Sequence, residues 1–223
     1  MLFVSKPVTK PTDIIPFLGK GEAHWRKGYS AYELAHAWID ANGIPDPVLT
    51  VLEQGDEYRG SMLIEGFFER ETQLRSKGRP SQTDLLALIK SSSGYRVVGI
   101  EGKVNETLGP LVSEWLAKPT PGKHTRLEIL CKTLGLATES VQPLRYQLLH
   151  RTCAAIYEAH GYAVDHTAML VHSFSADHAW FDDFQTFTDI LGVPVDRVNQ
   201  LSAPIELEGI TLRVGWVADL PQP

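Results

Sequence analysis

Cysteine is scarce in this sequence: of 223 residues only Cys131 and Cys153 are cysteines, and they form no Cys-x-x-Cys pair. Both lie in apolar stretches with helical spacing, so we expect reduced thiols inside a core rather than a disulfide framework. The eight histidines show no His-Glu-x-x-His or other metal-ligand spacing, which argues against a zinc site. The Gly-x-Ser-x-Gly motif of serine hydrolases and a Gly-rich phosphate loop are also missing from the sequence.

Long apolar runs are missing as well. No run approaches the roughly 18 residues that predict a membrane span, and Met1–Pro7 lacks the basic and then apolar segments of a secretory signal. We therefore expect a cytoplasmic protein that does not insert into a membrane. The formal net charge is −6, so the chain as a whole does not attract nucleic acid, and any phosphate-binding surface has to be a local basic groove.

What is present is the composition of an ordinary globule, with 43% hydrophobic and 22% charged residues. The patterning predicts an extended N-terminal arm over residues 1–29 and a single domain over residues 30–223. The domain begins with a helix at Ser30, whose capping-box partner is Glu33.

The remaining elements follow from apolar periodicity and turn residues. We expect strands near 61–68, 83–90 and 95–104, helices near 111–117, 125–134 and 145–160, a strand near 164–174, a helix near 179–191 and a hairpin over 205–217. Residues 48–52 fit either a strand or the start of a helix. This order predicts an α/β fold with a mixed central sheet flanked by helices.

Candidate chemistry gathers at the end of the third predicted strand, where Glu101 and Lys103 follow an apolar run. The period of two places both on one face of the strand, with Gly102 pointing away. A hairpin across residues 91–94 brings Asp84, at the start of the preceding strand, close to Glu101. Two carboxylates beside a lysine suit a hard cation such as Mg²⁺ or Mn²⁺, and the lysine can neutralise charge on a phosphate. The alternative is an exposed ion pair of Glu101 and Lys103 on a sheet edge.

The arrangement Asp84…Glu101-Gly-Lys103 resembles the active-site signature of the PD-(D/E)xK nuclease superfamily. In that superfamily the core runs helix, three strands, helix and strand, which matches the order expected here. The resemblance implies a restriction-endonuclease-like core, with Asp84, Glu101 and the Gly102 carbonyl as metal ligands and Lys103 as the catalytic lysine. It also implies that Glu33, on the first helix, belongs to the metal site.

The helix that follows the Glu-x-Lys strand carries a further part of this resemblance. Gln147 matches a polar residue that often faces the nuclease site, which implies a catalytic role for it. Gln147, His150 and Arg151 share one helical face, so we predict that Gln147 and Arg151 point at Glu101. The sequence departs from the superfamily pattern at Thr83, where a proline usually precedes the aspartate.

A second resemblance covers most of the chain. The runs Glu-Gly-Lys-Val-Asn-Glu-Thr-Leu-Gly-Pro, Leu-Arg-Tyr-Gln-Leu-Leu-His-Arg-Thr and Leu-Val-His-Ser-Phe-Ser are similar to those of a family of uncharacterised bacterial proteins, the DUF6946 type. This resemblance implies no particular activity.

Two main functions follow from these patterns, and an enzyme that acts on a small molecule with the same carboxylates is a third possibility. The first is a metal-dependent nuclease that hydrolyses phosphodiester bonds of DNA or RNA, with Mg²⁺ or Mn²⁺ as its cofactor and Asp84, Glu101, Lys103 and Gln147 as its catalytic residues. It needs a basic rim that binds nucleic acid, for which the candidates are Arg79, Arg126, Arg145 and Arg151. The second is a catalytically silent nuclease-like fold that acts as a binding or regulatory module, which the acidic net charge favours. The oligomeric state stays open, a homodimer included.

Overall fold

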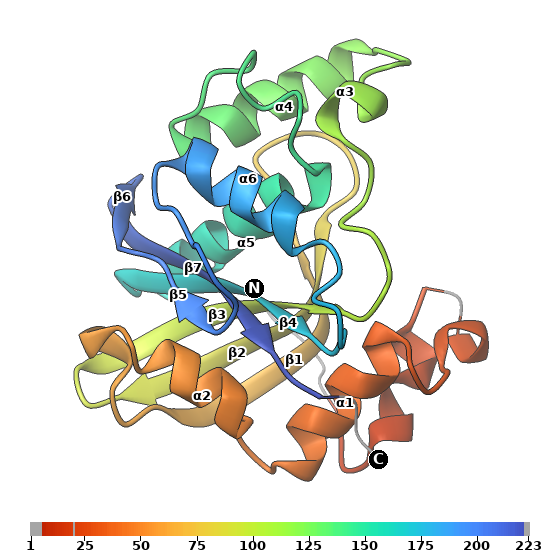
Figure 1. Cartoon of the computed structure of the whole chain (residues 1–223), viewed down its shortest axis with the longest axis vertical. Coiled ribbons are helices and arrows are strands. Elements are labelled where there is room, and N and C mark those ends of the chain that lie inside the picture. The colour runs from red at the N-terminus through yellow and green to blue at the C-terminus, as the bar shows by residue number, and fades with distance from the viewer. Residues whose placement is uncertain (1–5, 20, 221–223) are drawn as a thin grey trace.

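Seven β-strands form one mixed sheet within residues 6–19 and 21–220, the part of the chain that the computed structural model describes (Figure 1). The strands are β1 (Met62–Thr72), β2 (Ser81–Ser91), β3 (Gly94–Lys103), β4 (His166–Ser173), β5 (Gln200–Leu201), β6 (Ile205–Leu207) and β7 (Ile210–Ala218). Their order across the sheet is β1-β2-β3-β4-β7-β5, and β6 pairs with β7. The predicted mixed sheet and C-terminal hairpin are therefore confirmed.

Strand direction changes in the middle of the sheet. β1, β2 and β3 form an antiparallel meander, in which Phe67 lies opposite Leu86 and Leu86 lies opposite Gly99. β3, β4 and β7 run parallel, with Glu101 of β3 beside Val171 of β4. Parallel neighbours need crossover connections, which helices supply here. These central strands are covered on both faces, which explains why their sequences are nearly continuous apolar runs.

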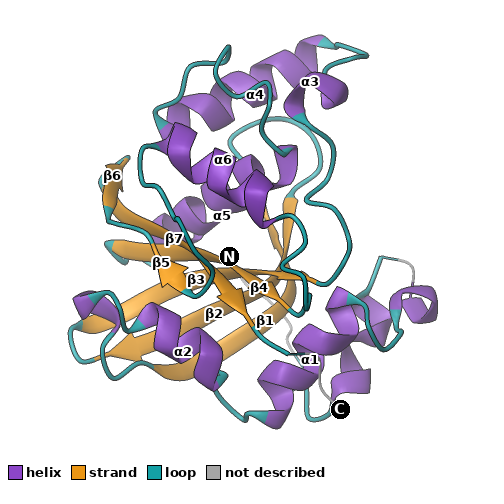
Figure 2. Cartoon of the chain, viewed as in Figure 1, coloured by secondary structure: helices purple, strands orange, loops and turns teal. Residues whose placement is uncertain are grey.

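Helices lie on both faces of the sheet (Figure 2). One face carries α1 (Ser30–Asp40) and α2 (Asp46–Leu52). The other carries α5 (Tyr146–Gly161) and α6 (Phe181–Leu191), with α4 (Pro121–Leu134) packed on α5 and the single turn α3 (Val112–Trp115) before it. None of the helices in the described ranges is long and apolar enough to cross a membrane.

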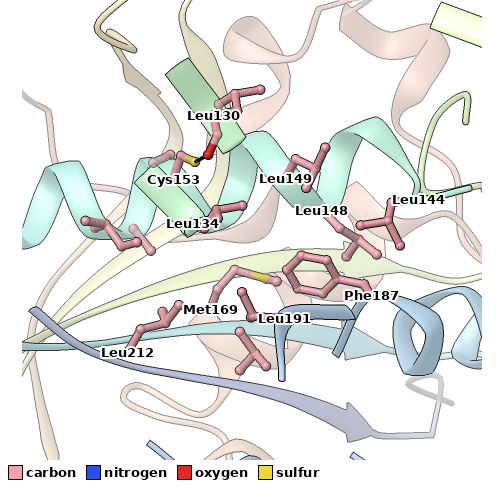
Figure 3. Close-up of a cluster of buried hydrophobic side chains, with 14 of the residues drawn as sticks. Leu130, Leu134, Leu144, Leu148, Leu149, Cys153, Met169, Phe187, Leu191 and Leu212 are labelled. Carbon is pink, nitrogen blue, oxygen red and sulfur yellow. Dashed lines mark hydrogen bonds between the residues drawn. The ribbon is translucent and has the colours of Figure 1, made fainter. Parts of the chain in front are cut away.

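The helix α5 positions the candidate site. Its apolar side enters a buried cluster, where Leu148 and Leu149 lie among side chains of α4, α6 and the parallel strands (Figure 3). The residues that the sequence predicts to pack on the sheet are all buried: Leu148, Leu149, Ile156 and Ala159. Gly99 of β3 lies against Ala155 of α5, since a Cβ at this position would be in ordinary van der Waals contact with the Cβ of Ala155, at 3.5 Å.

The prediction of an extended N-terminal arm is wrong for the residues that the structure describes. Pro11–Phe17 (η1) and Gly21–His24 (η2) form 3₁₀ helices, and Ile14 and Leu18 are buried against Ala35 of α1. The proline and lysine content suggested an arm, but two apolar side chains are enough to attach this segment to the domain. Residues 1–5 and 20 of the predicted arm lie outside the described residues.

The undecided segment over residues 48–52 is helical. It forms most of α2, whose first turn contains Pro47 at a position where proline costs the helix no hydrogen bond. A short 3₁₀ helix, η3 (Asp56–Tyr58), then leads into β1. Val48, Val51 and Leu52 are buried beneath the sheet, so packing decides in favour of the helix.

Candidate functional site

Strand register brings the two predicted carboxylates together. The β2–β3 pairing ends at Leu85 and Ile100, and just beyond it the Gly102 amide donates to Asp84 Oδ2 at 2.9 Å, which holds Asp84 beside the end of β3 that carries Glu101. Gly102 faces α1, since a Cβ there would lie 3.3 Å from a methyl group of Leu34. Glu101 therefore faces the other side of the sheet, toward α5.

Glu101 is the centre of a buried polar network. Its Oε1 accepts hydrogen bonds from Lys103 Nζ at 2.6 Å and from Gln147 Nε2 at 2.5 Å, and its Oε2 accepts one from Arg151 Nε at 2.5 Å. The prediction that Gln147 and Arg151 point at Glu101 is confirmed. Glu101 is 1% and Lys103 5% exposed, so the alternative of an exposed edge ion pair is wrong.

The charges in this network stabilise one another. Burial raises the pKa of Glu101, but the positive charges of Arg151 and Lys103 outweigh burial and hold that pKa at about 2. Burial lowers the pKa of Lys103, but the negative charges of Glu101 and Asp84 outweigh it, and the pKa is raised overall. Glu101 thus stays ionised and Lys103 stays protonated near neutral pH, inside an apolar surrounding that would otherwise penalise both charges.

The negative charge of Asp84 is balanced by fewer close positive groups than that of Glu101. Its Oδ2 accepts a hydrogen bond from the Gly102 amide at 2.9 Å, and its Oδ1 lies 3.8 Å from Arg151 Nη2. Burial, and next the negative charge of Glu101, raise the pKa of Asp84 to about 7. Near neutral pH a proton is therefore bound to Asp84 in a large fraction of molecules, because Arg151, 3.8 Å away, does not outweigh burial and the charge of Glu101.

A third carboxylate, Glu69, lies beside this pair and was missed by the sequence reasoning. Its neighbours Phe68 and Arg70 pair with Leu85 and Thr83, which places Glu69 opposite Asp84 on β1. Gln82 Nε2 donates to Glu69 Oε2 at 2.8 Å. Burial, followed by the charge of Asp84, raises the pKa of Glu69 to about 8.

The backbone of Glu69 is also unusual. Its φ is +54°, in the left-handed region that residues other than glycine rarely adopt. Such strain often accompanies functional sites. The available sequence signal was the Glu-Arg-Glu run that ends the first strand, but this run does not distinguish Glu69 from Glu71.

The network continues from Arg151 to the surface of α5. Arg151 Nη1 donates to Ser81 Oγ at 3.0 Å, and Ser81 Oγ lies 2.8 Å from His150 Nδ1. The Ser81 hydroxyl accepts from Arg151, and it either donates to His150 Nδ1 or accepts from it, according to the histidine tautomer. Burial and the charge of Arg151 hold the pKa of His150 well below its usual value, so the ring is neutral near neutral pH.

The other predicted site residues lie elsewhere. Glu33 is buried on α1, on the opposite face of β3 from Glu101, and its Oε1 accepts a hydrogen bond from the Gly28 amide at 2.7 Å. The structure therefore does not group Glu33 with the two carboxylates. Arg145 forms an ion pair with Asp183 of α6 at 2.9 Å.

The predicted basic rim is only partly at the surface. Arg151 is 8% exposed and belongs to the buried network, so it is not a surface residue of the rim. Arg126 donates to the hydroxyl of Tyr146 at 2.6 Å and to the carbonyl of Arg79 at 2.7 Å. The side chain of Arg79 is exposed, two residues before Ser81.

The donor set of this site fits a hydrated hard cation. Asp84 and Glu101 offer carboxylate oxygens from adjacent strands, and Mg²⁺ commonly binds proteins through one or two carboxylates while it keeps several waters. Within the described ranges no group of three or more His, Cys, Asp or Glu side chains is placed to hold a metal ion. A cation at this pair would therefore depend on water and substrate oxygens for its remaining ligands.

Comparison with known proteins adds the family. The family model DUF6946, described as a domain of unknown function, matches residues 7–221. The chain belongs to the DUF6946 family. No curated protein and no solved structure matches it. The function of this DUF6946 chain therefore has to be inferred from the chemistry of its own residues.

Proposed function

We propose that this DUF6946 chain is a metal-dependent nuclease that hydrolyses phosphodiester bonds of DNA or RNA at Asp84, Glu101 and Lys103. The observation that carries the proposal is the convergence of these three side chains with Gln147 of α5 in one buried polar network. Keeping so many charged groups in a protein interior is costly, and such costs are typical of functional sites. The element order α1, β1 to β3, α5 and β4 agrees with the restriction-endonuclease-like core that the resemblance implies, and supports the same proposal.

Asp84 and Glu101 are the residues that would hold the cation. A bound Mg²⁺ or Mn²⁺ supplies positive charge for a phosphate oxygen and for the attacking water. Asp84 offers a carboxylate whose positive partner, Arg151, lies 3.8 Å away, and a bound cation would replace the proton that its pKa of about 7 leaves on part of the molecules. Glu101 is suited to holding the cation because it remains ionised near neutral pH.

The remaining side chains would neutralise the charge of the phosphate or hold the carboxylates in position. Lys103 stays protonated and can neutralise the negative charge that develops on the phosphate. Gln147 holds one oxygen of Glu101 through a neutral donor, which fixes the carboxylate without adding charge. Arg79, and Arg126 beside it, would contact the phosphate backbone outside the network.

One observation favours the second candidate function, a catalytically silent fold that binds a partner. Both oxygens of Glu101 already accept hydrogen bonds from protein donors, two of them charged. A buried carboxylate whose two oxygens are both bonded to protein donors can also have a purely structural role, as part of an ion cluster that stabilises the fold. The two candidates differ in whether neutralising Asp84 affects catalysis, since a structural cluster has no catalysis to lose.

The experiment compares cleavage of labelled single-stranded DNA, double-stranded DNA and RNA in Mg²⁺ or Mn²⁺ by the wild type, Asp84→Asn and Lys103→Ala. Asp84→Asn keeps the shape and should abolish cleavage, and Lys103→Ala should slow it by about 10² or more. Lys132→Ala, an exposed lysine of α4, is the matched control and should cleave like the wild type. The nuclease proposal fails if the wild type cleaves none of the substrates, or if Asp84→Asn cleaves as fast as the wild type.

A further inference from the structure

Arg151 lies between the two carboxylates that would hold the metal. Its Nε donates to Glu101 Oε2 at 2.5 Å, its Nη2 lies 3.8 Å from Asp84 Oδ1, and its Nη1 donates to Ser81 Oγ at 3.0 Å. The three nitrogens of one planar guanidinium thus face three acceptors on β2 and β3. The residue is 8% exposed and projects from α5, so packing fixes it in this position.

The guanidinium occupies oxygens that a cation would need. Glu101 Oε1 is shared by Lys103 and Gln147, and Arg151 takes Oε2. Three of the roughly four lone-pair sites of Glu101 are therefore occupied, and an ion that binds the Asp84–Glu101 pair has to share Oε2 with Arg151 or displace it. Arg151 approaches both carboxylates. Gln147 carries no charge and donates to Glu101 alone of the two.

Charge makes this competition strong. Two positive groups within a few ångströms repel each other, and the repulsion is largest where water is scarce. A divalent cation between Asp84 and Glu101 would stand next to the guanidinium in a buried environment. The planar fork of arginine also forms stronger and more directional bonds to carboxylates than a lysine does, so Arg151 does not leave readily.

We propose that Arg151 excludes divalent cations from the Asp84–Glu101 pair in the resting protein, so that the pair binds a cation only after Arg151 has moved off the carboxylates. This inference rests on the proposed function, since it takes the pair as the metal site. It also indicates what would release Arg151: a phosphate group, which a guanidinium can bind through two parallel hydrogen bonds. Arg151 would then link the arrival of a phosphodiester to the loading of the metal.

The test measures the affinity of the metal-binding pair for Mn²⁺ alone, by calorimetry on the whole chain without nucleic acid. Arg151→Gln removes the charge, and it should tighten Mn²⁺ binding by about 10- to 100-fold, the size expected when a charged hydrogen bond no longer competes. Arg213→Gln is the matched control. Arg213 also donates through Nε to a glutamate, Glu57, at 2.5 Å, but it lies away from the pair, so Mn²⁺ affinity should not change.

A second variant covers the case in which Arg151→Gln does not fold. Arg151→Lys keeps the charge but cannot reach both carboxylates with one planar group, and it should tighten Mn²⁺ binding about threefold or more. If the folded variants bind Mn²⁺ no more tightly than the wild type, or bind none at all, Arg151 does not exclude the cation. Cleavage by the wild type is measured in a separate assay. If the wild type cleaves nucleic acid but the variants bind Mn²⁺ with unchanged affinity, the proposed function stands and this inference is overturned. Tightened Mn²⁺ binding without any cleavage supports the inference and overturns the proposed function.

Discussion

Asp84 should make the protein less stable as the pH rises. Burial and the charge of Glu101 raise its pKa from 3.8 to about 7, so between these values the folded chain holds a proton that the unfolded chain has released. The resulting stabilisation is fully present below about pH 4 and is lost as the pH rises through about 7. The difference between the two pKa values corresponds to about 4 kcal/mol in the free energy of unfolding. Because 24% of the side chain is exposed to solvent, we expect about 2 to 3 kcal/mol.

Asp84→Asn isolates this effect. The asparagine oxygen can still accept from the Gly102 amide, but the residue has no charge to bury. The excess of the variant over the wild type in free energy of unfolding should be smallest below about pH 4, grow between about pH 4 and pH 7, and reach about 2 to 3 kcal/mol at pH 9. Glu69 remains in both proteins, but the charge of Asp84 contributes to its raised pKa, so the difference reports on the titration of Asp84 together with its effect on Glu69.

Urea unfolding followed by tryptophan fluorescence at pH 5, 6, 7, 8 and 9 measures the effect. Asp196→Asn, at an exposed aspartate in a loop, serves as the control and should show no such dependence. A difference between the wild type and Asp84→Asn that stays constant from pH 5 to pH 9 would refute the reasoning, because Asp84 would then titrate in its ordinary range.

Three further changes test other parts of the structure by urea or thermal unfolding. Gln147→Leu removes one of the donors to Glu101 and should cost about 1 to 2 kcal/mol, whereas no loss would mean that this bond is dispensable. Ile14→Ala should cost about 2 kcal/mol, and a negligible cost would show that η1 is not part of the folded domain. Trp38→Phe removes the donor to the buried Nδ1 of His172 and should cost about 1 to 2 kcal/mol; an unchanged melting temperature would contradict that role.

The order of elements could be predicted because apolar periodicity and turn residues are local signals. The Glu-x-Lys strand and the helical spacing of Gln147 and Arg151 were enough to place these side chains on facing surfaces. The predicted strand over 61–68 proved longer at its C-terminal end, where polar residues such as Glu69 continue to pair. Strand ends of this kind depend on partners that single-sequence patterns do not contain.

The features that sequence reasoning missed depend on tertiary packing. The left-handed backbone of Glu69 and its position opposite Asp84 arise from the pairing of β1 with β2, which no local pattern encodes. Arg151 was expected both to face Glu101 and to belong to a basic rim; the first expectation is confirmed, and its burial between two carboxylates removes it from the rim. The N-terminal segment was expected to be extended because its composition outweighed the apolar contacts of Ile14.

The most direct test of the central claim is the anomalous scattering of Mn²⁺ in crystals of the wild type grown with an uncleavable oligonucleotide. The account predicts a peak about 2.1 Å from carboxylate oxygens of both Asp84 and Glu101, with Arg151 moved onto a phosphate. An ordered oligonucleotide at this site with no Mn²⁺ peak between the two carboxylates, and with Arg151 still bound to Glu101, would contradict it.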